Sequence, residues 1–122
     1  MVMRRLALVA LMGAMTASVS AQSATLAEAG KQLYASKECA RCHMVKGKGN
    51  KMSKLDGVAS KLSARDIGRW LSAPAEMEAT LDHKPKVRMS SRKSLKNLTQ
   101  ADVAALVAYL MTLKQRETAD TR

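Results

Sequence analysis

The pattern of apolar and polar positions predicts three helices in this chain of 122 residues. The first runs from Leu26 to Ser36, where apolar or small residues recur at the i, i+3, i+4, i+7 and i+8 spacing of a helix. Thr25 is its expected N-cap, and Glu28 would complete a capping box. The last helix begins after a cap at Thr99 and carries a stripe of five apolar residues: Val103, Leu106, Val107, Leu110 and Leu113.

The pattern between these two helices is weaker. Ser63 is expected to cap a short middle helix, and Pro74 closes that helix or begins the turn after it. Residues 46–54 and 80–98 have no sustained period and are rich in Lys, Arg and Ser, so we expect loops there. A loop as long as 80–98 needs a functional reason in a small domain, and wrapping one face of a cofactor would be such a reason.

Residues 1–21 have the features of a secretory signal peptide. Arg4 and Arg5 form a basic start, an apolar stretch follows, and small residues precede a cleavage site after Ala21. The apolar stretch is short for a membrane span, although an uncleaved signal anchor is the alternative. Cleavage would leave residues 22–122 as one small domain.

The main candidate for chemistry is the motif C-x-x-C-H at Cys39-Ala40-Arg41-Cys42-His43, which contains both cysteines of the chain. This motif is the attachment signature of c-type haem: each cysteine can form a thioether with a haem vinyl group, and the histidine can bind the iron. The alternatives are a dithiol redox pair, half of a zinc site, or coincidence. No βαβ pattern surrounds the pair, and the one other histidine, His83, lies forty residues later.

Composition favours a core completed by a cofactor and a basic surface. The chain has no Phe, one Trp and two Tyr, so a porphyrin would supply apolar bulk that its side chains lack. The net charge is +11, and residues 46–96 hold thirteen Lys or Arg against five Asp or Glu. Such a surface would attract acidic redox partners; the alternative is a plain solvated face. Basic and aromatic residues do not alternate as in nucleic-acid binding, and membrane contact would be peripheral at most.

From Leu26 to Lys114 the order of elements resembles the class I cytochromes c, in particular the small bacterial, monohaem type. Gly30 and Tyr34 match the glycine and the aromatic residue of that family's first helix, and Tyr109 matches the aromatic residue of its last helix. The resemblance implies an all-α fold, with three to four helices wrapped around one covalent haem c and its iron. It also implies export to the periplasm, because the family's haem is attached outside the bacterial cytoplasmic membrane.

The resemblance further implies that a methionine from an intervening loop is the second iron ligand. Met89 fits this role best, since it lies 46 residues after His43 and ten residues before the last cap. It departs from the family in one respect: Arg88 and Ser90 flank it, where family members usually have a proline nearby. The alternatives are an open site or one of three other residues: His83, Met52 and Met77.

With His43 and Met89 on the iron, the resemblance implies a one-electron carrier rather than an enzyme. The alternatives are a haem-based gas sensor or peroxidase-like protein with an open distal site, and a dedicated cytochrome subunit of a larger oxidoreductase complex. We expect a monomer whose partners are redox proteins with acidic docking surfaces. The resemblance implies that Trp70 packs against the haem or donates a hydrogen bond from its indole N–H to a haem propionate; the alternative is core packing alone.

Overall fold

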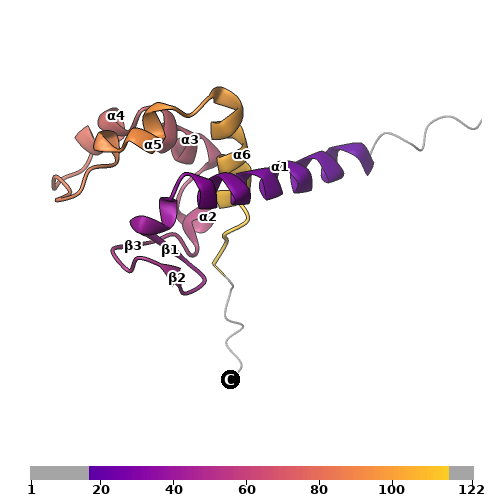
Figure 1. The fold of residues 1–122 in the computed structure, drawn as a ribbon, viewed down its shortest axis with the longest axis horizontal. Coiled ribbons are helices and arrows are strands. Elements are labelled where there is room, and N and C mark those ends of the chain that lie inside the picture. The colour runs from indigo at the N-terminus through magenta and orange to yellow at the C-terminus, as the bar shows by residue number, and fades with distance from the viewer. Residues whose placement is uncertain (1–16, 116–122) are drawn as a thin grey trace, which may run out of the picture.

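The computed structural model describes residues 17–115 and confirms the helical fold class (Figure 1). The described part holds six α-helices, where three or four were predicted. Three of the six have only four to six residues, which is too short for the pattern of apolar residues to distinguish them from loops. The α-helices are α1 (Ala17–Ser36), α2 (Val58–Lys61), α3 (Ala64–Ser72), α4 (Pro74–Ala79), α5 (Lys93–Lys96) and α6 (Gln100–Leu110). The described part also holds two 3₁₀-helices, η1 (Cys39–Arg41) and η2 (Met89–Ser91), and three short strands, β1 (His43–Val45), β2 (Lys48–Gly49) and β3 (Ser53–Lys54).

Helices α1 and α6 cross in close contact (Figure 1). A Cβ atom added to Gly30 would overlap the carbonyl oxygen of Ala105 and lie 2.7 Å from Cβ of Tyr109. Only glycine therefore lets the two backbones approach this closely. Beside the crossing, the rings of Tyr34 and Tyr109 pack edge to face, with their centroids 5.6 Å apart.

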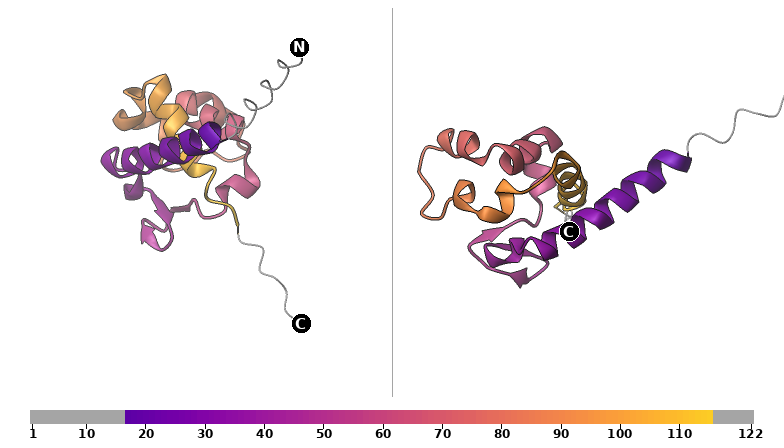
Figure 2. Two further views of the ribbon diagram at one scale, coloured as in Figure 1. Left: turned by 90° about the vertical axis from the view of Figure 1, so that its right-hand side faces the viewer. Right: turned by 45° about the horizontal axis from the view of Figure 1, so that its top comes forward.

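The predicted start of the first helix is wrong. Helix α1 begins at Ala17, so Thr25 lies inside it and its hydroxyl donates a hydrogen bond to the Ala21 carbonyl at 2.8 Å instead of capping. The physical reason is that residues 17–24 include no proline or glycine that would stop a helix. This first part of α1 extends away from the rest of the fold (Figure 2).

The proposed signal peptide is mostly outside the described residues. Residues 1–16 are not described, so the leader 1–21, its cleavage and the domain 22–122 remain predictions. Within residues 17–115, no helix combines the length and the apolar character needed to cross a bilayer.

The two other predicted caps are confirmed. The Ser63 hydroxyl accepts a hydrogen bond from the Asp66 amide at 3.1 Å and so caps α3. Pro74 is the first residue of the next helix, α4. At α6, Thr99 Oγ1 accepts from the Asp102 amide at 3.1 Å, and Asp102 Oδ2 accepts from the Thr99 amide at 3.0 Å. This reciprocal pair is a complete capping box. The buried faces of these helices contribute most of the core, with Ile67, Leu71, Leu106 and Leu110.

Two strands of a small sheet, β2 and β3, lie within the predicted loop 46–54, and the third, β1, directly precedes it. The strand order of the sheet is β2-β1-β3, with β2 antiparallel and β3 parallel to β1. Strands of two or three residues are too short for the alternation of apolar and polar positions to be detected in a sequence. The chain reverses between β1 and β2 through left-handed conformations at Lys46 and Gly47, whose φ angles are 49° and 75°.

Candidate functional site

The C-x-x-C-H motif lies directly after α1. Glu38 has a left-handed conformation, with a φ of 58°, and turns the chain out of the helix into η1. The Cys42 amide then donates a hydrogen bond to the Cys39 carbonyl at 3.2 Å, so one helical turn separates the two cysteines. Both are half-buried free thiols, and burial raises the pKa of Cys39. No group of three or more His, Cys, Asp or Glu that could hold a metal ion occurs among residues 17–115, which leaves the zinc hypothesis without ligands there.

His43 is a half-buried residue at the start of β1. Burial lowers its pKa, and a hydrogen bond with the backbone of Ser53 on β3 opposes that effect. Its Nδ1 atom is buried and has no hydrogen-bond partner in the described part of the chain. Buried polar atoms of this kind are rare, and a neutral imidazole is the form that binds a metal. The chemistry of His43 therefore fits an iron ligand.

The β1–β2 segment holds the motif in place. The Asn50 amide donates to two carbonyl oxygens of the motif, that of Ala40 at 3.0 Å and that of His43 at 3.1 Å. Gly49 has a φ of 108°, and a Cβ atom there would overlap the His43 carbonyl oxygen. The sequence pattern missed this support, although Gly49-Asn50 is a turn-forming pair whose presence could have indicated it.

Met89 is half-buried and begins η2, in the loop between α4 and α5. This loop and the sheet that follows the cysteine motif lie on the same side of the molecule, opposite the extended start of α1 (Figures 1 and 2). The other candidates are placed differently: Met52 is 59 % exposed, His83 is exposed, and Met77 is buried as part of α4. Met89 is thus the candidate that combines partial burial with a position in a loop.

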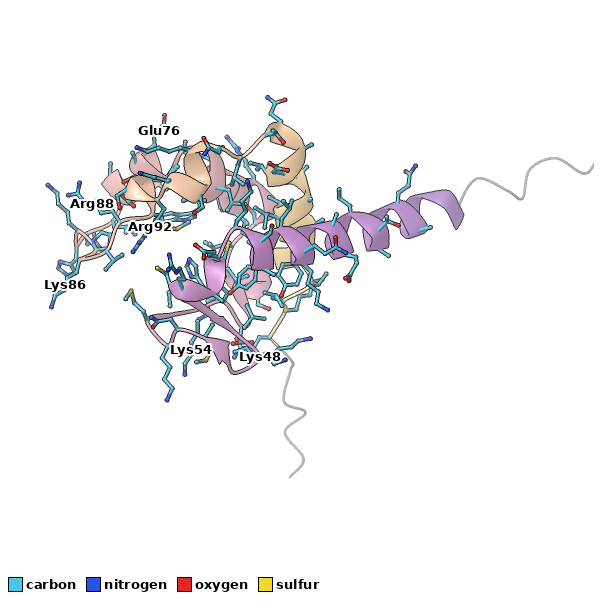
Figure 3. The ribbon with its side chains drawn as sticks, viewed as in Figure 1. Lys48, Lys54, Glu76, Lys86, Arg88 and Arg92 are labelled. Carbon is cyan, nitrogen blue, oxygen red and sulfur yellow. The ribbon has the colours of Figure 1, made fainter. Side chains whose placement is uncertain are left out.

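Basic side chains surround this side of the molecule. Figure 3 shows them on two segments that are distant in sequence, the sheet and the loop before α5. All are exposed, and none forms an ion pair among residues 17–115, where the one ion pair joins Arg41 to Glu38. The labelled residues are Lys48, Lys54, Lys86, Arg88 and Arg92.

An open groove of about 760 Å³ lies among α3, α4, α5 and the start of α6. Arg65, Arg69 and Lys96 contribute to its walls, whereas Cys39 and Met89 do not. The groove reaches the Met89 turn through Ser90, but its walls include neither the cysteines nor Met89. The placement of the motif, rather than this groove, therefore identifies the site.

The sequence pattern also missed Glu78. Its side chain is 8 % exposed and accepts two hydrogen bonds from Ser90, the neighbour of Met89. Nothing in the sequence distinguishes it from Glu76, an exposed residue of the same helix.

A family model described as Cytochrome c matches residues 27–114, which includes the C-x-x-C-H motif, Met89 and α6. Searches of curated proteins and of solved structures gave no match.

Proposed function

The chain belongs to the cytochrome c family, and from that membership we propose which of its residues hold and ligate the haem. The family carries covalently attached haem c with iron, and the chain is accordingly a haem-based electron-transfer protein. We assign Cys39 and Cys42 to the two thioether bonds and His43 to the proximal position on the iron. The observation that carries this assignment is the half-buried imidazole of His43, which has an unpartnered ring nitrogen and directly follows the two free thiols.

We propose Met89 as the distal ligand. Its sulfur is uncharged and polarisable, and its loop lies on the same side of the molecule as the motif (Figure 1). Met77 is a buried residue of the helix α4 rather than of a loop, and the exposed loop residue His83 is not held by any hydrogen bond in the described structure. A haem iron held by His43 and Met89 would have no free coordination position, and the thioether would favour the ferrous state and so raise the reduction potential. The proposed function is therefore one-electron transfer without binding of a substrate to the iron.

We further propose that the protein works in the periplasm and meets redox partners through acidic surfaces on those partners. The support for acidic partner surfaces is the set of exposed basic residues of the sheet and of the loop before α5, which lie on the side of the candidate site (Figure 3). Complementary charge accelerates encounter and is weakened by salt. Fast, weak encounters of this kind suit a carrier that must be released after each electron.

Oxidation of the ferrous holoprotein by ferricyanide tests this function. We expect rapid one-electron oxidation that carbon monoxide does not slow, because no axial position is open. The rate should fall several-fold between about 0.01 and 0.15 M salt, since the Debye length shrinks from about 30 Å to about 8 Å. An uncharged quinone oxidant is the control and should show little dependence on salt. Binding of carbon monoxide to the ferrous protein would instead support the gas-sensor or peroxidase-like alternative.

A further inference from the structure

Glu78, near the end of α4, is a buried acidic residue. Only 8 % of its surface is exposed, whereas Glu76 is exposed and points outward from the same helix (Figure 3). Removing a carboxylate from water is unfavourable unless hydrogen bonds replace those made with water. The burial of Glu78 therefore requires hydrogen-bond donors from the protein.

Those donors come from Ser90, twelve residues later in the chain. The Ser90 amide donates to Oε1 of Glu78 at 3.0 Å, and the Ser90 hydroxyl donates to Oε2 at 2.7 Å. Hydrogen bonds to an ionised carboxylate are short and about twice as strong as those between neutral groups. These two bonds are the main reason that the pKa of Glu78 lies below its usual value. Burial opposes them, while the Met89 amide and the charge of Arg88 lower the pKa by smaller amounts.

The Ser90 amide belongs to the peptide group that joins Met89 to Ser90. The other hydrogen bonds of this turn are local: Ser91 donates to the Arg88 carbonyl, and the Arg92 amide donates to the Met89 carbonyl at 2.9 Å. They fix the shape of the turn but do not attach it to a helix. In the described structure, Glu78 supplies the hydrogen bonds that connect the Met89 turn to α4.

The chain on the N-terminal side of the turn gives it little support. Residues 81–88 form no helix or strand, and all of them except Pro85 are exposed. Leu81 and Val87, the apolar residues of this loop, are 42 % and 40 % exposed and bury little surface. The position of the turn therefore depends strongly on its hydrogen bonds to Glu78.

We propose that Glu78 is a positioning residue for the distal side of the haem site. Its carboxylate holds the peptide group of Met89 and thereby keeps the methionine sulfur available to the iron. This inference rests on the proposed function, because positioning of Met89 affects the iron only if Met89 is the distal ligand. Without the carboxylate, Met89 would leave the iron more often, and an added ligand would compete with it more successfully.

Imidazole binding to the ferric holoprotein tests the proposal. Glu78→Gln keeps the size of the side chain but loses its charge and one of its two acceptors, so we expect imidazole affinity to rise about tenfold. Glu78→Ala loses both acceptors and should show a larger rise, together with a weaker red charge-transfer band of methionine-ligated ferric haem. Glu76→Gln is the matched control, since it removes an exposed charge from the same helix, and its imidazole affinity should equal that of the wild type.

The outcomes separate this inference from the proposed function. If Met89→Ala binds imidazole much more tightly than wild type while Glu78→Gln does not, Met89 remains the ligand and the positioning role is refuted. A lower unfolding midpoint for Glu78→Gln with unchanged imidazole affinity also refutes it, because that result describes a merely structural residue. If Met89→Ala itself binds imidazole like the wild type, the assignment of Met89 fails. If Glu78→Ala yields no holoprotein, the imidazole affinity of Glu78→Gln alone decides whether Glu78 has the positioning role.

Discussion

Replacing Cys39 and Cys42 together by serine is expected to remove all covalently bound haem from the protein. A serine hydroxyl is not acidic enough to act as a nucleophile at neutral pH, so neither thioether can form. Each single variant retains one thiol and should keep a reduced amount of covalent haem. The measurement is haem staining of the protein after denaturing electrophoresis, compared with total protein.

The double serine variant should also be less stable as a folded domain. The core contains few aromatic side chains, and a porphyrin would contribute much of the apolar surface that folding buries. We therefore expect a loss of cooperative thermal unfolding in the double variant. Haem that remains bound to the double serine variant after denaturation would contradict the assignment of these cysteines.

Alanine at position 30 is expected to destabilise the fold by more than about 3 kcal/mol. The added Cβ atom would overlap the Ala105 carbonyl oxygen and lie 2.7 Å from Cβ of Tyr109, so α1 and α6 must move apart. A backbone carbonyl cannot move out of the way as the end of a side chain can. The measurement is the free energy of unfolding of the holoprotein in guanidinium chloride.

Gly68→Ala is the matched control for this prediction. Gly68 also lies in a helix and faces α6, but its added Cβ would meet Val107 Cγ2 at 3.7 Å, an ordinary contact distance. Both variants gain the same helix propensity, worth about 1 kcal/mol, and Gly68→Ala should retain most of that gain. Equal stabilities for the two variants would contradict the tight crossing of α1 and α6.

The parts of the fold that could be predicted from the sequence depend on local chemistry. Ser63 and Thr99 cap helices because their hydroxyls accept a hydrogen bond from the backbone amide three residues later, and capping residues at the start of an apolar pattern are visible in the sequence. Gly30 could be identified because the family resemblance links it to an aromatic pair, and the observed crossing confirms that link. The match to the family model over residues 27–114 confirms the family.

The features that could not be predicted depend on contacts between distant segments. Thr25 is a local exception: it has the residue type and spacing of a cap, but no proline or glycine stops the helix before it and α1 continues through this segment. The burial of Glu78 depends on Ser90, which approaches it only after the loop has folded back. The motif could be identified as a haem site, and Gly49-Asn50 indicates a turn after it, but the carbonyl groups to which Asn50 donates could be found only from the fold.

The most direct test of the central assignment is the visible spectrum of the purified ferric holoprotein, for the wild type and for Met89→Ala. We expect the weak red charge-transfer band of methionine-ligated haem c in the wild type and its absence in the variant. We also expect the reduction potential of the variant to fall on the order of 0.1 V, within the range of about 0.8 V over which axial ligands tune haem proteins. A wild-type protein that lacks the band, or a variant that keeps it, would show that Met89 is not the distal ligand.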